Sequence, residues 1–571
     1  MRRHRNRDNG FVLALLAISL VVLVGFAGFA VDLGHWYLTA ARAQNAADAS
    51  ALGGVVFLPG NIGSAESVAL RLAEGHGYPN GDVTVAPGER PNQLQVTVTR
   101  EVNNFFVSVF GINRTRITRS ATAEFEGPVP MGSPENFLGN DPELGNLPDH
   151  WMNVASVRNN AVNGDRYHAG LCPANGSLGP CVSPYPGITN PNYAVNGHFF
   201  AVEVAPGTPG PLRIQVFDPA FYEVGDRCER PNIFNIDAAN AEALQALAQG
   251  RPDIPDDWYD DALERYAGGS NQRWCTGDWR AGANLTGSSG PIDTTFIVRA
   301  PDSTPWIDSD NPVVNTASCA PRQFSGHTEG WMQADGRLFG KLAGGSESGV
   351  TGPEQTLANT FRRWVTVCEI PDPVPGKYLL QVRTNAALGS PLVANTSVNT
   401  HGHNRYSIRA GTGDPSSPSF SGGVRVFASG RLPIYVNADG ADTIFYLARV
   451  TPSTTQRLLN VSLWDISDGG SSGSMQILPP AEFGANFPGC SFSKSGGNWT
   501  VNAGDCSFSF NAGALDAHLV QVQIPIPEDY TCNEASATGC WIRVRAPFTG
   551  SVNDTTTWSA DIVGDPVRLV N

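Results

Sequence analysis

Four aspartates lie where the chain could bind a calcium ion. Asp218 and Asp465 each end an alternating strand segment, and Asp308 and Asp310 lie in the oxygen-rich run Asp-Ser-Asp-Asn. Carboxylates and loop carbonyl oxygens are the ligands that Ca²⁺ prefers. Their spacing matches neither an EF-hand loop nor a nonapeptide repeat, and aspartates commonly cap turns through their own backbone. The pattern favours turn capping, so the four are only calcium candidates and we assign no metal site.

Two histidines, His401 and His403, stand at alternate positions in Thr-His-Gly-His and could share a metal ion. No third ligand accompanies them, and the composition favours a surface loop before a strand. The chain also lacks the zinc-protease motif HExxH, the phosphate-binding GxxxxGK(S/T) loop and a GxGxxG turn opening a helix. We therefore expect no catalytic residue, no cofactor and no enzymatic activity.

All ten cysteines lie between Cys172 and Cys540. An even number of cysteines indicates disulfides and an oxidising compartment. Short loops cost the least entropy to close, which favours pairing between neighbours in the sequence. The expected disulfides are Cys172–Cys181, Cys228–Cys275, Cys319–Cys368, Cys490–Cys506 and Cys532–Cys540.

The composition is that of a β-rich protein. Charged residues make up only 16% of the chain, while Gly (62) and Pro (42) are abundant, which is typical of short strands joined by turns. The net charge of −15 disfavours nucleic acid as a partner, because phosphate contacts need a basic face. A length of 571 residues predicts several domains.

One apolar segment predicts a membrane anchor. Residues 11–31 form a run of 21 residues without a charge, about enough to cross the ~30 Å hydrocarbon core of a bilayer. Arginines at positions 2, 3, 5 and 7 precede it, so residues 1–10 are expected to form a cytoplasmic stub and the bulk of the chain to lie outside the cytoplasm. The alternative is a cleaved secretory signal, since Gly28-Phe29-Ala30 offers small residues to a signal peptidase.

The helix is expected to continue beyond this span to Gly53-Gly54, because the sequence after Asp32 is rich in alanine. Ala40, Ala43, Ala47 and Ala51 recur at helical spacing and form a stripe of small residues. Such a stripe allows close approach by another element. We expect it to pack against the protein's own domain, and an intermolecular seam is the alternative.

The segment FAVDLGHWYLTAARAQNAADASALGG, after a basic stub and an apolar span, resembles the N-terminus of the TadE/TadG-like proteins of Tad (Flp) pilus assembly. The resemblance extends to about residue 125, with a second helix over 64–74 and strands over 82–86, 94–100 and 115–125. It implies a membrane-anchored protein with a small α+β region at 32–127. The family-motif positions are Asp32, Gly34, Tyr37, Arg42, Gln44, Asn45, Ala46, Ala47 and Asp48.

One departure bears on the type of family member. Prepilin-like members carry a glutamate five residues after the processing site, and Leu15 stands at that point after Gly10. A carboxylate in an apolar span is costly and is normally retained for a reason. Its absence favours the TadG type, which the resemblance implies stays anchored and presents a large outer domain.

The remainder is expected to form two antiparallel β-sandwiches. Residues 128–149 are rich in Gly, Pro, Asn and Asp and predict a linker. After it, alternating segments recur in the same order in two copies, at 150–428 and 429–571, and each copy needs two packed sheets to bury its apolar faces. The first copy carries a partly helical insertion at about 238–290.

These observations predict a multidomain protein: a transmembrane helix continuing into a small α+β domain, then two mainly-β sandwiches. The resemblance implies a non-enzymatic structural or assembly protein of a Tad/Flp pilus system, with the membrane and pilus-assembly or secretion proteins as partners. The alternative is a surface adhesin or carbohydrate-binding protein that acts on a surface glycan or envelope ligand. Its aromatic candidates are Trp274, Trp279, Trp306 and Trp331.

Overall fold

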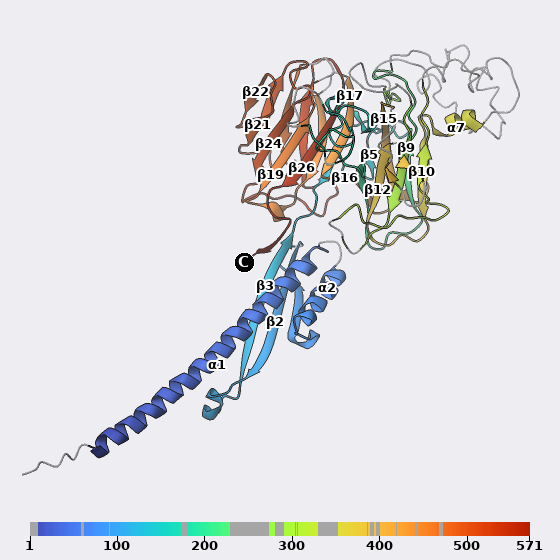
Figure 1. Cartoon of the computed structure of the whole chain (residues 1–571). Coiled ribbons are helices and arrows are strands. Elements are labelled where there is room, and N and C mark those ends of the chain that lie inside the picture. The colour runs from blue at the N-terminus through green and yellow to red at the C-terminus, as the bar shows by residue number, and fades with distance from the viewer. Residues whose placement is uncertain are drawn as a thin grey trace, which may run out of the picture. The chain divides into compact units, whose positions relative to one another are not determined.

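A single helix, α1 (Asn9–Val55), occupies most of the first sixty residues (Figure 1). Its 47 residues correspond to about 70 Å at a rise of 1.5 Å per residue. No proline interrupts it, and it ends just after Gly53 and Gly54, as the sequence predicts. The helix is long and apolar enough to span a membrane, which is consistent with a single-pass membrane protein.

The computed structural model covers the whole chain, and its described residues are 9–58, 62–90, 92–172, 181–183, 185–228, 273–279, 291–302, 304, 307–328, 352–384, 386–388, 393–394, 400–417, 419–439, 442–467 and 472–570. These residues form two compact units. Unit 1 contains Met1–Gly127 and Gly564–Asn571, and unit 2 contains Pro128–Asp302 and Ile307–Val563.

Unit 1 is the α+β region expected from the sequence. Helices α1 and α2 pack on an antiparallel sheet in the order β1-β2-β3-β27, and the 3-10 helices η1 and η2 lie in its connections. Figure 1 shows β2 and β3 running alongside α1. The bounds are α2 Ile62–Gly75, η1 Asn80–Asp82, β1 Val83–Pro87, β2 Gln93–Asn103, η2 Val107–Phe110, β3 Arg114–Phe125 and β27 Val567–Val570.

From the repeat we expected the last strand of the chain, β27, to belong to the second sandwich. The structure instead places β27 in the sheet of unit 1. It pairs antiparallel with β3, with Val567 opposite Phe125. Arg568 forms an ion pair with Glu124 at 2.9 Å, and the Glu124 side chain is only 1% exposed. Period-2 alternation predicts a strand but not its partner. In the sequence, unit 2 is therefore an insertion between two neighbouring strands of unit 1.

Unit 2 contains two large, mostly antiparallel sheets that share one hydrophobic core. The first sheet has 11 strands in the described chain, in an order that runs across both predicted sandwiches. In that order its strands are β10 Arg322–Phe324, β9 Thr294–Arg299, β12 Gly376–Thr384, β7 His198–Val204, β16 Val424–Ser429, β4 Pro130–Met131, β18 Asp442–Arg449, β25 Trp541–Pro547, β20 Gly473–Leu478, β23 Ser507–Phe510 and β22 Trp499–Asn502.

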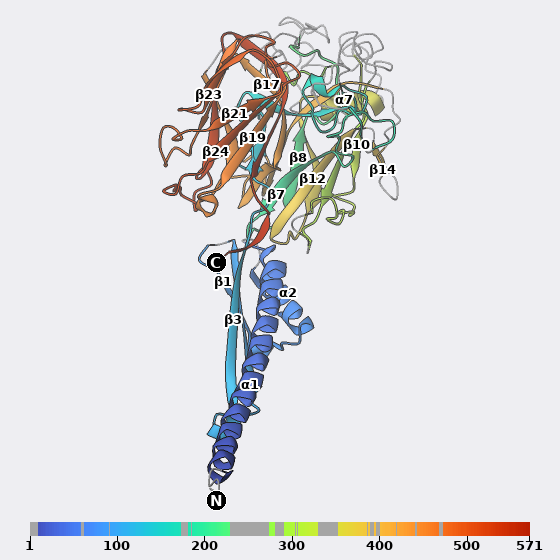
Figure 2. The ribbon, with the colours of Figure 1, turned by 60° about the vertical axis from the view of Figure 1, so that its left-hand side comes forward.

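The second sheet of unit 2 is built in the same way, and Figure 2 shows β19, β24 and β21 side by side at one end of it. Strand β5 (Phe137–Leu138) pairs with β15 off the main path. The main path is β11 Trp364–Ile370, β8 Leu212–Phe217, β15 His403–Thr412, β6 His150–Ala155, β17 Arg431–Asp439, β26 Ser551–Ile562, β19 Leu458–Trp464, β24 Leu519–Pro525 and β21 Ser491–Lys494.

A few short elements complete the described part of unit 2. Strands β13 and β14 pair with each other as a separate ribbon. The short elements are η3 Ala161–Asn163, α7 Gly352–Thr360, β13 Ala386–Ala387, β14 Val393–Ala394 and η4 Pro452–Thr454.

The internal repeat is visible in the strand pairing. Strand β8 lies between β11 and β15, and its counterpart β19 lies between β24 and β26. Likewise β7 pairs with β12, and β18 pairs with β25. The two copies do not form separate compact units, however, because β6 of the first copy pairs with β17 of the second.

Two expected boundaries are wrong, and one lies outside the described residues. Residues 128–149 are not a linker, because β4 pairs with both β16 and β18, and β5 pairs with β15. The break expected near 428 falls within strand β16, inside a single compact unit. Most of the insertion expected at about 238–290 lies outside the described residues.

Four of the five expected disulfides are present, and the fifth is not. Cys490 is half-buried, Cys506 is buried, and both are free thiols. A hydrogen bond with Cys490 and burial both raise the pKa of the Cys506 thiol. The disulfides present are Cys172–Cys181, Cys228–Cys275, Cys319–Cys368 and Cys532–Cys540.

Deletion of residues 564–571 should destabilise unit 1, because it removes β27 and the Arg568 partner of buried Glu124. We expect the amides of Thr122, Glu124 and Glu126, which face β27 and the residue before it, to exchange with deuterium faster by about an order of magnitude or more. Hydrogen–deuterium exchange with mass spectrometry measures this. The matched variant Arg568→Gln keeps the strand and should retain most of the protection; unchanged exchange in the deletion would contradict the pairing.

Candidate functional site at the membrane anchor

Asp32 connects helix α1 to a loop 73 residues further along the chain. Its Oδ1 accepts a hydrogen bond from the backbone N–H of Phe105 at 2.7 Å, and its Oδ2 accepts from Phe106 at 2.8 Å and Val107 at 2.7 Å. Asp32 is fully buried. A buried carboxylate is stabilised when backbone N–H groups donate hydrogen bonds to it. Asp32 therefore fixes the position of the loop along the helix.

The loop is the turn between β2 and β3, which we call the hairpin tip (residues 104–113). Asn104 fastens it from within: its Nδ2 donates to the carbonyl of Ile112 at 2.8 Å, and its Oδ1 accepts from Nε1 of Trp36 on α1 at 2.8 Å. The rings of His35 and Phe105 are in contact, with centroids 5.2 Å apart. The hairpin tip is thus also attached to α1 by a polar and an aromatic contact in the turn that follows Asp32.

One turn before Asp32, the hairpin tip approaches the helix closely at Gly28. A Cβ atom at Gly28 would lie 2.7 Å from the ring of Phe106, which is closer than carbon atoms can approach. Gly34, on the other side of Asp32, has nothing within 4 Å of that position. Glycine is therefore required at residue 28 by the packing of Phe106, and Gly34 has no such constraint in unit 1.

Further along α1, a face of small residues packs on the sheet and on α2. Ala43, Ala47 and Ala51 are fully buried in the core of unit 1, which confirms that the stripe packs against the protein's own domain. Ala40 is only half-buried. Gln44 bridges helix and sheet, because its Nε2 donates to Asp48 Oδ1 at 2.8 Å and to the Ser120 carbonyl at 3.2 Å.

The family-motif positions divide between the two faces of α1. On the face toward the sheet, Asp32, Ala46 and Ala47 are buried, and Gln44 and Asp48 are half-buried. The remaining four positions are exposed and have no role in the core of unit 1. They are Gly34, Tyr37, Arg42 and Asn45.

The helix of this site is similar to a known family. Residues 10–56 match the family model described as Putative Flp pilus-assembly TadE/G-like. The match confirms the resemblance of the N-terminal region and covers essentially the helix α1. No curated protein and no solved structure matches the chain.

The TadE/G-like match ends before the residues that Asp32 binds. Sequence reasoning identified Asp32 as a motif position, but it did not identify residues 105–107 as its partners. The missing contact spans 73 residues, and no local pattern encodes it. The sequence offered only an indirect signal for this contact. One acidic residue follows the uncharged span, and one hairpin turn further along the chain carries no charge.

The calcium candidates Asp218 and Asp465 hold equivalent corners of the two repeats. Each aspartate directly follows its strand, β8 or β19, and has a positive φ, 54° for Asp218 and 57° for Asp465. Each accepts a hydrogen bond from a backbone N–H two residues before the strand that pairs with its own. The donors are Arg362, before β11, at 3.0 Å and Ala517, before β24, at 2.6 Å. These contacts agree with turn capping. Asp308 forms an ion pair with Lys377 at 2.8 Å.

Within the described ranges, Glu482, Cys532 and Cys540 form the one group of three potential metal ligands that lie close together. The two cysteines are joined as a disulfide, so they offer no thiolate to a metal ion. Neither the four aspartates nor His401 and His403 belong to this group.

His403 lies in the buried interior of unit 2. Its Nδ1 is 3.0 Å from Asn153 Oδ1, and its Nε2 is next to Asn159 Nδ2. One ring nitrogen therefore donates and the other accepts, which is the pattern of a neutral imidazole. Burial and the nearby Arg405 guanidinium lower the pKa of His403 to about 3. Both ring nitrogens are occupied by amide side chains, so His403 acts as a core residue.

Of the four aromatic candidates for a glycan platform, the two that the structure describes are not exposed. Trp274 is fully buried, and Trp279 is half-buried and stacks on His403. Trp306 and Trp331 lie outside the described residues.

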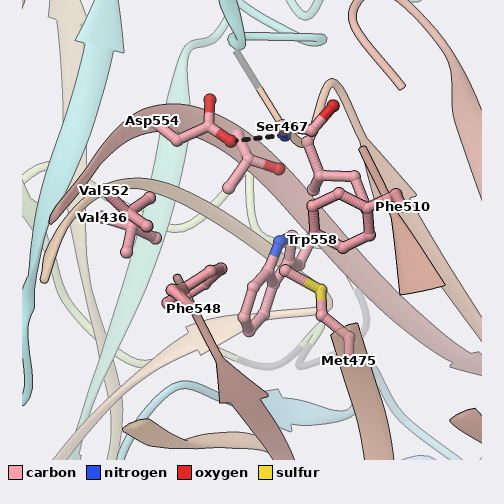
Figure 3. Close-up of a pocket in the computed structure, with 10 residues that line it drawn as sticks. Val436, Ser467, Met475, Phe510, Phe548, Val552, Asp554 and Trp558 are labelled. Carbon is pink, nitrogen blue, oxygen red and sulfur yellow. Dashed lines mark hydrogen bonds between the residues drawn. The ribbon is translucent and has the colours of Figure 1, made fainter. Parts of the chain in front are cut away.

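A small apolar pocket lies within the second repeat, lined by Met475, Phe510, Phe548 and Trp558 among others (Figure 3). Asp554 is at its rim, where its carboxylate accepts the backbone N–H of Ser467 at 2.7 Å. The pocket has room for about one water molecule. It is therefore far smaller than a typical small-molecule site.

Asp32→Ala should detach the hairpin tip, because it removes the acceptor of three backbone N–H groups. We expect the amides of residues 105–107 to lose their protection from hydrogen exchange, while Asp32→Asn, with one acceptor oxygen, loses only part of it. Exchange on the full chain in lipid nanodiscs measures this. Asp48→Ala on the same helix is the control and should leave 105–107 protected; if both alanine variants behave alike, the assigned role of Asp32 is wrong.

The buried His403 should make unit 2 less stable in acid. Its pKa is about 3 in the folded protein and about 6.5 when unfolded, so between these values only the unfolded chain binds the proton. Stability is then lost as the pH falls below about 6.5, by up to about 1.4 kcal/mol per pH unit from this residue. We expect His403→Gln to show a smaller fall in melting temperature from pH 7 to pH 5 than wild type. His76→Gln, an exposed histidine in unit 1, is the control.

Proposed function

We propose that the protein is a non-enzymatic, membrane-anchored component of a Tad/Flp-type pilus system, with unit 2 on the extracytoplasmic side. The observation that carries the proposal is the coincidence of the TadE/G-like match with α1, the helix that can span a membrane. The same helix carries the buried face that organises unit 1. In this proposal the matched segment both anchors the protein and supplies the helix on which the sheet of unit 1 packs.

The orientation follows from charge and from disulfides. Arginines 2, 3, 5 and 7 precede the apolar span, and such clusters remain in the cytoplasm. All four disulfides lie in unit 2, which requires an oxidising compartment for its assembly. Both observations support a cytoplasmic N-terminus and an outer unit 2.

A structural role is supported by how the candidate chemical groups are used. Asp218 and Asp465 hold corners, Asp308 pairs with a lysine, and His403 is enclosed by amides. The pocket described above has room for about one water molecule. These groups stabilise the fold, so we propose that the protein acts by contact with other envelope or pilus proteins.

Affinity purification from cells tests the pilus assignment. The full chain is tagged and isolated from its native host and from a strain that lacks the Tad-type ATPase and pilin genes. We expect pilus-assembly proteins to co-purify only from the first strain. A matched variant substitutes alanine for Tyr37, Arg42 and Asn45, the exposed motif positions of α1 outside the core of unit 1, and should bind fewer of these proteins than the wild-type chain does in the first strain. Binding to a surface glycan that is unchanged in the deletion strain would favour the adhesin alternative instead.

Sequencing of the mature chain tests the anchor itself. We expect the membrane fraction to contain a protein that retains residues 11–31. A chain that begins near Val31 and is released into the medium would show that the segment is a cleaved signal.

A further inference from the structure

The hairpin tip carries an unusual concentration of exposed apolar side chains. Beyond α1, the described part of unit 1 has seven large apolar residues that are exposed, and five of them lie in these ten residues. Val109 and Phe110 are the most exposed, at 83% and 81%. The other three are Phe105, Phe106 and Ile112. Single exposed apolar residues are normal in soluble proteins, whereas a contiguous cluster indicates a binding surface.

The position of the hairpin tip along α1 indicates which environment its exposed side chains contact. Phe106 packs on Gly28, which lies three residues before the end of the uncharged run at Val31. At 1.5 Å per residue, this is about 4–5 Å inside the apolar span. Interfacial membrane segments bury their apolar face about 5–10 Å into the boundary between headgroups and acyl chains. A bilayer that surrounds residues 11–31 would therefore meet the hairpin tip at that boundary.

The backbone of the hairpin tip is prepared for an apolar environment. The N–H groups of Phe105, Phe106 and Val107 donate to Asp32, and those of Val109 and Gly111 donate within the turn. The residues from Val102 to Asn113 contain no charge. Unsatisfied backbone groups cost several kcal/mol in lipid, so this internal pairing removes the main obstacle to insertion.

Positive charge follows the hairpin tip on β3. Arg114, Arg116 and Arg119 are exposed, and Arg114 also pairs with Glu101 at 3.4 Å. Arg116 lies opposite Glu101 in the strand register. Arginines just beyond an apolar wedge can contact the phosphates of lipid headgroups. The apolar hairpin tip would lie among the acyl chains, and the arginines of β3 would lie among the headgroups. This is the order of the two layers in a leaflet.

We propose that the hairpin tip is a second membrane contact, which inserts into the outer leaflet of the bilayer that α1 spans. The inference rests on the anchoring role proposed above and adds a separate surface to it. The bilayer is favoured over a protein partner because the exposed apolar surface of the hairpin tip is continuous with that of α1 at Gly28, which lies in lipid in any case. The contact would fix the tilt and rotation of unit 1 at the membrane.

Photo-crosslinking of the full chain in lipid vesicles tests this proposal. A photoreactive benzoylphenylalanine replaces Phe110 in one variant and Val109 in a second, both of which are exposed and outside the core. We expect mass spectrometry to detect lipid adducts at both positions. Leu20, within the apolar span, is the positive control. Ile62 is the negative control, because it is 44% exposed in the same unit but follows the far end of α1, about 35 Å of helix beyond Val31.

The outcomes separate this proposal from the anchor assignment. Lipid adducts at Leu20 and at residue 109 or 110, with Ile62 at background, support the insertion. Lipid adducts at Leu20 alone overturn it and leave the anchor intact. Crosslinks from residues 109 and 110 to a second copy of the chain, or to another protein in native membranes, overturn it in favour of a protein partner. Absence of lipid adducts at Leu20 contradicts the anchor and this inference together.

Discussion

The carboxylate of Asp32 is the constraint on which the membrane-proximal structure depends. A charge directly after an uncharged span must be compensated, and here three consecutive backbone N–H groups of the hairpin tip compensate it. Because those groups are rigidly spaced, the contact fixes the position of the hairpin along α1. The small side chains of α1 then allow the sheet to lie close to the helix over the following turns. Helix, hairpin and sheet are thereby held as one body.

The return of β27 to unit 1 gives unit 2 two connections to the anchor domain. The chain leaves unit 1 after β3 and re-enters at β27, and these strands are antiparallel neighbours. Glu126 donates its N–H to the Pro566 carbonyl at 2.7 Å, so the exit and the re-entry points are adjacent. Insertions at a point where the chain ends are close together cost little loop entropy. A force on unit 2 would be shared by two paired strands instead of one linker.

Much of this fold was predictable, because the deciding signals are local. The uncharged span, the alanine stripe and the period-2 strands each follow from neighbouring residues, and the repeat was visible because its strands recur in order. The errors concern partners. The segment 128–149 has a turn-like composition, yet two residues at Pro130–Met131 are enough to join β16 and β18. The strand at Val567 was recognised, but its pairing with β3 depends on residues more than 400 positions away.

In the candidate site too, single residues could be identified from the sequence, whereas their partners could not. Asp32 was identifiable from its position after the span, and its partners at 105–107 were not. Cys490 and Cys506 are close enough in the sequence to predict a disulfide, yet both are free thiols, and sequence spacing alone does not distinguish the two states. The corner aspartates were placed correctly at strand ends, and their equivalence became clear only when Arg362 and Ala517 proved to share a positive φ.

Strand pairing across the repeat boundary explains why the two repeats form one unit. In sequence, β4 precedes the first repeat, yet it pairs both with β16 at the end of that repeat and with β18 of the second. In the other sheet, β6 and β17 join the repeats directly. Separating the copies would expose strand edges in both sheets, with unpaired backbone groups and part of a shared core. Neither repeat therefore has a complete sandwich of its own, and the pair is expected to fold and unfold together.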